Sequence, residues 1–131
     1  MIRGVVAGLK TIVQMKDRWT FIFHTLLIWL MYFLMTYVLV FALPATSHLS
    51  PLDGMFLLVI GGLGMSAPVQ GGIGAFHWIV ALGLSLYGVP RTDAVAYATL
   101  SHESQAIFAV LLGGLSFVML MIQNRKALQN K

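Results

Sequence analysis

Residues 61–77 read GGLGMSAPVQGGIGAFH, and they interrupt an otherwise apolar part of the chain. The segment holds six of the 13 glycines, a proline, a glutamine and a histidine, and long apolar runs lie on both sides of it. Glycine and proline both weaken helices, so the segment predicts a break where a membrane-spanning helix would otherwise continue. Inside lipid, a broken backbone persists only where protein or a water-filled cavity satisfies its N–H and C=O groups. The break is therefore the first candidate for a functional site.

The composition indicates an integral membrane protein. Of the 131 residues, 59% are hydrophobic and only 9% are charged, which is too apolar for a soluble domain of this length. The chain has no cysteine, so disulfides and thiolate metal sites are excluded. The net charge of +4 comes from residues that flank the apolar runs, and it does not predict a nucleic-acid partner.

The positions of the basic residues predict the topology. Four of them precede the first apolar run, namely Arg3, Lys10, Lys16 and Arg18. Three follow the last run, namely Arg125, Lys126 and Lys131, and Arg91 alone lies between the runs. Positive charge collects on the cytoplasmic side of a membrane. We therefore expect a multi-pass protein whose two termini are both cytoplasmic.

The apolar runs predict an all-α fold, namely a polytopic transmembrane helical protein with a broken or re-entrant helix pair. The predicted transmembrane domain covers residues 19–122, with helices at about 19–43, 52–66, 72–87 and 94–122, between an amphipathic or juxtamembrane segment at 1–18 and a basic cytoplasmic tail at 123–131. The outer two helices are long enough to cross a hydrocarbon core of about 30 Å, whereas the inner two are not. The inner two form either a re-entrant hairpin or two short spans. The lack of charge between them favours the hairpin.

The break has a composition that suits an anionic group. A helix that begins near Gly72 would point its first N–H groups, and the positive end of its dipole, into the break, where a phosphate or carboxylate fits. Transporters use the ends of half-helices in this way. The glycines would equally allow two crossing helices to pack closely, and the residues alone leave both interpretations open.

Three ionisable side chains are expected near the break. His77 lies about one turn into the second short helix, and His102 and Glu103 lie at a similar depth if the hairpin enters from the outer face. Glu103 is the only acidic residue inside an apolar run, and such residues usually face a cavity or a partner. A histidine opposite a carboxylate can carry or sense a proton, or the two can form a buried pair that fixes helix packing. Without an HExxH motif or a cysteine cluster, no metal site is predicted.

These motifs also carry a family resemblance. Pro68, Gly71, Gly72 and Gly74 precede a helix, the turn GVP at 88–90 and the polar stretch TLSHESQ at 99–105. From about residue 20 to 120 the chain resembles the C-terminal part of the lysylphosphatidylglycerol synthase transmembrane family, which includes flippase-like proteins. The form GGLGMSAPVQGGIGAFHW with TLSHESQ is similar to a subgroup from Bacteroidetes-type bacteria.

The chain departs from the family pattern at three positions. The usual signature is close to PxPGGxGxxE, with an arginine near the start of the last helix. Here Gln70 stands where the second proline is common, His77 stands at the glutamate position and His102 lies near the arginine position. If the glutamate and arginine form an intramembrane pair in the family, the two histidines replace a permanent ion pair with a titratable one.

The resemblance implies a domain of the bacterial inner (cytoplasmic) membrane that moves or accommodates a lipid. Family domains are much longer, so the chain is expected to be a C-terminal portion that is completed by a missing N-terminal half or by a second copy. No soluble aminoacyl-transferase domain and no catalytic motif is found in the sequence, which leaves the question of an enzyme open.

Our leading hypothesis is a flippase-like lipid translocase that acts on membrane lipids with anionic or zwitterionic headgroups. The expected substrate-binding residues are Pro68, Gln70, Gly71, Gly72, Gly74, His77, His102, Glu103 and Gln105. Two alternatives are a non-transporting accessory or assembly subunit and the membrane part of a lipid-modifying system. No cofactor is predicted.

Overall fold

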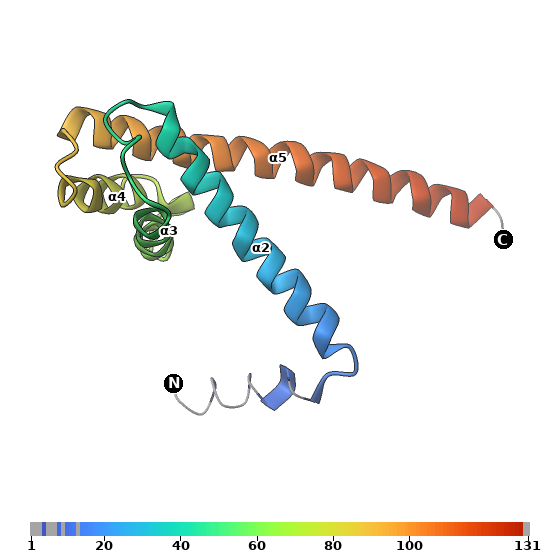
Figure 1. Cartoon of the computed structure of the whole chain (residues 1–131). Coiled ribbons are helices and arrows are strands. Elements are labelled where there is room, and N and C mark those ends of the chain that lie inside the picture. Colours follow the sequence, from blue (N-terminus) through green and yellow to red (C-terminus); the bar gives the residue numbers. More distant parts are fainter. Residues whose placement is uncertain (1–3, 5–7, 9, 13, 130–131) are drawn as a thin grey trace. The chain divides into compact units, whose positions relative to one another are not determined.

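The computed structural model describes residues 4, 8, 10–12 and 14–129. Every regular element in this part of the chain is a helix, which confirms the all-α class (Figure 1). The elements are α2 (Arg18–Val38), the 3-10 helix η1 (Leu39–Ala42), α3 (Pro51–Met65), the 3-10 helix η2 (Gln70–Gly72), α4 (Ala75–Ser85) and α5 (Arg91–Gln129). Residues 1–3, 5–7, 9 and 13 of the amphipathic segment predicted at 1–18 lie outside the described residues, as do residues 130 and 131 of the predicted tail.

The chain divides into two compact units, Met1–Leu34 and Met35–Lys131, with the boundary inside α2. In the first unit, polar side chains of α2 bond to the backbone of their own helix. The Thr25 hydroxyl donates to the Phe21 carbonyl at 2.8 Å, and His24 Nδ1 lies 2.7 Å from the Thr20 carbonyl oxygen. Most apolar side chains of this part of α2 are exposed, as expected of a helix surrounded by lipid.

The residues at the start of α3 explain why the helix begins there. Ser50 is the N-cap and Pro51 follows it, where the missing N–H of proline has no cost. The Asp53 carboxylate accepts from the Ser50 N–H at 2.8 Å, and the Ser50 hydroxyl accepts from the Asp53 N–H at 3.4 Å. Hydrogen bonds from Ser50 hold the pKa of the exposed Asp53 carboxyl below its ordinary value. Each of the two side chains thus accepts from the backbone N–H of the other residue, and this capping box stabilises the first turn of α3.

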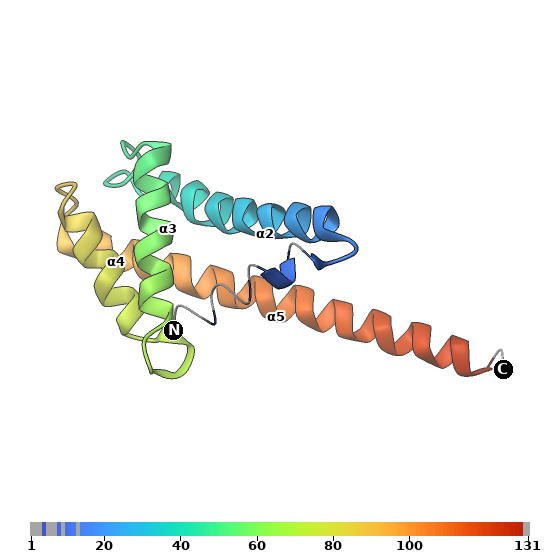
Figure 2. The same ribbon diagram turned by 90° about the horizontal axis from the view of Figure 1, so that it is seen from below.

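Helices α3 and α4 form a hairpin, with the break at its tip (Figure 2). The two helices approach closely through glycines of α3. A Cβ atom added at Gly64 would lie 2.7 Å from the Cα atom of Phe76, and one added at Gly61 would lie 2.8 Å from the Phe76 ring. These glycines therefore serve helix packing, which is one of the two interpretations that the sequence leaves open for the glycine-rich segment.

The core of the second unit joins the hairpin to α5 and to the end of α2. Its fully buried members include Leu57, Val80, Leu84 and Tyr97. The Tyr97 hydroxyl donates to the Thr36 carbonyl at 2.7 Å in a buried position. Since a buried hydroxyl needs a partner, this bond fixes the first turns of α5 against the last turn of α2.

Two helical stretches are long and apolar enough to cross a membrane, namely Arg18–Ala42 and Arg91–Arg125. They match the first and last predicted helices, although α5 extends to Gln129 instead of ending near residue 122. Helix α3 is apolar but shorter. From Gln105 to Met121 nearly every side chain of α5 is exposed, so this surface of the described part is available to lipid or to other helices.

Candidate functional site

The break between α3 and α4 has a backbone that only glycine adopts easily. Residues 66–69 form turns and bends, η2 follows, and Gly71, Gly72 and Gly74 all have positive φ values between 63° and 84°. Side chains with a Cβ atom rarely tolerate this conformation. Helix α4 begins after Gly74, at Ala75, and not near Gly72 as the sequence pattern predicts, because Ile73 has an extended ψ of 129° and Gly74 has a φ of 84°.

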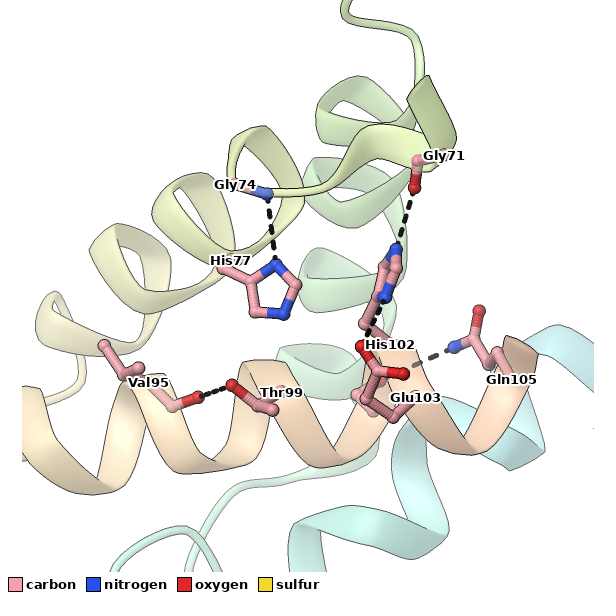
Figure 3. A network of polar contacts seen from close by, with 9 residues as sticks. Gly71, Gly74, His77, Val95, Thr99, His102, Glu103 and Gln105 are labelled. Atoms are coloured by element: carbon pink, nitrogen blue, oxygen red, sulfur yellow. Dashed lines mark hydrogen bonds and ion pairs between the residues drawn. The ribbon is translucent and has the colours of Figure 1, made fainter. Parts of the chain in front are cut away.

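His102 reaches from α5 to the break. Its Nε2 atom lies 2.8 Å from the carbonyl oxygen of Gly71, 31 residues away in the chain (Figure 3). A carbonyl only accepts hydrogen bonds, so Nε2 carries a proton and donates. The side chain is only 10% exposed, and its ring lies 5.2 Å from the Phe76 ring, centroid to centroid. The Gly71 carbonyl, which the break leaves without a helical hydrogen bond, thus accepts one from a side chain of α5.

His77 lies in the first turn of α4. The Gly74 N–H donates to His77 Nδ1 at 3.4 Å, which is a long hydrogen bond. The His77 ring is half-buried, and its centroid lies 5.0 Å from that of His102. The remaining N–H groups of the first turn have no acceptor within their own helix. The positive end of α4 therefore points into the region that both histidines border.

Glu103 completes the cluster. Its Oε1 atom lies 3.4 Å from His102 Nδ1, and its side chain is 59% exposed. Metal-binding atoms of His77, His102 and Glu103 all lie within 4.8 Å of one another, and we call these three residues the His/Glu cluster. The sequence places His77 at a similar depth to the other two, but only the packing of α4 on α5 brings their side chains together.

The other predicted site residues either lie apart from the His/Glu cluster or shape the backbone of the break. The Gln105 amide donates to the Ser101 hydroxyl at 3.5 Å within α5. Gly72 is buried, and a Cβ atom there would meet Met65. In the described part of the chain, no hydrogen bond joins the side chains of Gln70 or Gln105 to the His/Glu cluster. Pro68 has no polar side-chain atom, and its contribution is to the turn.

A groove of about 420 Å³ runs between α4 and the start of α5. Polar groups lie at both ends, with His77 at the break and Ser85 and Arg91 at the opposite end. The wall between them is mainly apolar. The lining residues are Gly74, His77, Trp78, Ala81, Leu82, Ser85, Arg91 and Val95. The sequence does not predict this groove, although one signal points to it: Arg91 is the only basic residue between the first and last apolar runs.

A family model described as the lysylphosphatidylglycerol synthase TM region matches residues 3–113. The chain belongs to this family. The match covers the break, the groove and the His/Glu cluster, so all of these features lie within the family's membrane region. Neither the curated proteins nor the solved structures include a sequence or fold that matches the chain.

Family membership and the two long apolar helices together identify a membrane protein of a lipid-related family. A membrane environment also explains the exposed apolar surface of α5, because apolar side chains carry no penalty when lipid surrounds them. The polar groups of the break and the His/Glu cluster are then the unusual part of the molecule, since buried or lipid-facing polar groups are expensive without partners.

Proposed function

We propose that this chain is a flippase-like membrane domain in which a phospholipid headgroup passes the His/Glu cluster while its acyl chains remain in lipid. The observation that carries the proposal is the groove between α4 and α5, which leads from Arg91 to His77 along an apolar wall. A polar headgroup crosses hydrocarbon readily only where polar partners replace water. The groove offers such partners at both ends.

The chemistry of the partners favours anionic or zwitterionic headgroups. The guanidinium of Arg91 suits a phosphate, to which it can donate two parallel hydrogen bonds. The first turn of α4 adds N–H groups and the positive end of a helix dipole. The Glu103 carboxylate would pair with the amine of a zwitterionic or aminoacylated headgroup. Gly74 lines the groove, and its lack of a side chain would let the headgroup approach the backbone closely.

The proposed placement is the bacterial inner membrane, with both termini in the cytoplasm, because basic residues flank the outer apolar runs. In this placement α3 and α4 form a re-entrant hairpin, since α3 has 15 residues and α4 has 11, and neither length crosses a core of about 30 Å. The exposed surface of α5 would contact lipid or a second copy of the chain.

The proposal is tested by lipid translocation in proteoliposomes. Phospholipids with a fluorescent headgroup are quenched from outside by a membrane-impermeant reductant, so the rate at which inner-leaflet lipid becomes accessible measures translocation. We expect Glu103→Gln and Arg91→Gln to slow it by about tenfold or more, because a hydrogen bond to a charged group contributes about 1.5–3 kcal/mol. Arg91→Gln should slow an anionic lipid more than a zwitterionic one.

The matched controls are His48→Ala and Arg125→Gln, which change ionisable residues away from the groove. Both should translocate lipid at the native rate. If the native protein does not exceed empty vesicles, or if Glu103→Gln and Arg91→Gln match the controls, the flippase proposal is wrong.

One observation favours the accessory-subunit alternative. The hydrogen bond from His102 to the Gly71 carbonyl already has a structural use, because it ties α5 to the break. If variants of the cluster lower the stability of the protein or its binding to a partner and leave lipid movement unchanged, the cluster is a packing device. A product with a chemically altered headgroup would instead support a lipid-modifying enzyme.

A further inference from the structure

His102 is held in the orientation of a metal ligand. Its Nε2–H donates to the Gly71 carbonyl at 2.8 Å, and histidines that bind metals typically donate their other ring N–H to a carbonyl or carboxylate. This bond fixes the tautomer in the neutral ring, so the lone pair is on Nδ1. Nδ1 lies 3.4 Å from Oε1 of Glu103.

The distance between these two atoms matches a shared ion. His102 Nδ1 and Glu103 Oε1 lie 3.4 Å apart, and two ligands about 2.0 Å from a tetrahedral zinc ion are separated by about 3.3 Å. A neutral Nδ1 and a carboxylate oxygen are both acceptors. Two acceptors at this distance repel each other unless a proton, a water molecule or a metal ion lies between them, and the spacing is the one that a shared metal ion requires.

His77 supplies a third ligand from the other helix. A metal-binding atom of its ring lies within 4.8 Å of those of His102 and Glu103. Its present hydrogen bond with the Gly74 N–H is long, at 3.4 Å, so turning the ring toward the other two ligands gives up only a weak bond. Among the described residues, and apart from the two chain neighbours of Gly74, no atom lies within 4 Å of a Cβ built on Gly74, so the start of α4 is open at this point.

We propose that the His/Glu cluster binds a divalent transition-metal ion of the zinc class. Two imidazoles and one carboxylate suit zinc and related ions, and three protein ligands leave a fourth position for water or a ligand oxygen. The ion also balances the charge of Glu103, for which His102 is the only ion-pair partner among the described residues. The proposal does not depend on lipid translocation.

The test is zinc binding by the full chain in detergent or nanodiscs, without a histidine tag. The protein is stripped with a chelator and titrated with ZnCl₂ against a chromophoric competitor, and the retained metal is measured by elemental analysis. We expect about one zinc per chain. Co²⁺ bound at the same site should give the visible absorption of a tetrahedral complex, which zinc then displaces.

Variants separate the cluster from the other histidines. His77→Ala and Glu103→Gln should each weaken zinc binding about tenfold or more, whereas the matched controls His24→Ala and His48→Ala should bind as the native protein does. Glu103→Gln keeps the shape of the side chain, and His77→Ala leaves the His102–Gly71 bond intact, so both retain the fold as judged by helical circular dichroism. Absence of zinc, or equal binding by all four variants, would overturn the proposal.

Discussion

Replacement of Gly64 by alanine tests whether α3 and α4 pack as the structure shows. The added Cβ atom would lie 2.7 Å from the Cα atom of Phe76 and 2.8 Å from Cγ2 of Ile79. Carbon atoms at their optimal separation are about 3.5–4.0 Å apart. The Phe76 Cα atom belongs to the backbone and cannot rotate away, so the two helices must separate by roughly 1 Å.

The size of the effect follows from two opposing terms. Overpacking of a closely packed contact costs about 1–3 kcal/mol, and replacing glycine by alanine in a helix gains up to about 1 kcal/mol. Gly62, two residues earlier in α3, has open space where alanine would place its Cβ atom: apart from its own helix, no atom of the described residues lies within 4 Å. Gly62→Ala should therefore gain helix stability without overpacking, and the free energies of unfolding of the two variants should differ by about 1–3 kcal/mol.

The assay is reversible unfolding in mixed micelles, followed by helical circular dichroism and compared between Gly64→Ala, Gly62→Ala and the native protein. Gly62→Ala should be as stable as the native protein or more stable, and Gly64→Ala should be less stable than both. The pair Gly64→Leu and Gly62→Leu should show the same order with a larger difference. If Gly64→Ala is as stable as Gly62→Ala, the hairpin does not pack through Gly64.

Three further predictions concern single hydrogen bonds. Tyr97→Phe leaves the Thr36 carbonyl without its buried donor and should lower the free energy of unfolding by about 1–3 kcal/mol, whereas the exposed Tyr32→Phe should change it little. The lowered pKa of Asp53 stabilises the fold above the carboxyl's ordinary pKa of 3.8, and this contribution is lost as the pH falls through the lower folded value. In an NMR titration, Ser50→Ala should move that pKa upward, and an unchanged value would refute the capping box. His102→Ala frees the Gly71 carbonyl and should speed amide exchange at residues 69–74, while His48→Ala should leave exchange there at the native rate.

Several features of the fold follow from local sequence. The apolar runs predict the long first and last helices, which the structure has at Arg18–Ala42 and Arg91–Arg125. The clustered glycines and Pro68 predict the interruption at 61–77, which the structure has between Met65 and Ala75. These predictions succeed because hydropathy and glycine conformation depend on a few neighbouring residues.

The exact start of α4 could not be read from the glycines alone. Composition shows that a break occurs, but the positive φ values of Gly71, Gly72 and Gly74 decide that helical geometry resumes only at Ala75. Likewise, the two uses of glycine, close packing at Gly64 and a left-handed backbone at Gly74, look identical in sequence. They are distinguished by the backbone conformation at each residue and by what lies opposite it.

Composition and hydropathy are enough to identify an all-helical membrane protein with a glycine-rich break and a small number of ionisable residues near it. Only the packing of the helices establishes that His102 bonds to Gly71, that His77 joins His102 and Glu103, and that Arg91 borders the same groove as His77. The physical reason is that α3, α4 and much of α5 are apolar on every side. Without a polar face, helical periodicity does not show which side of a helix meets its neighbour, and side-chain packing selects that side.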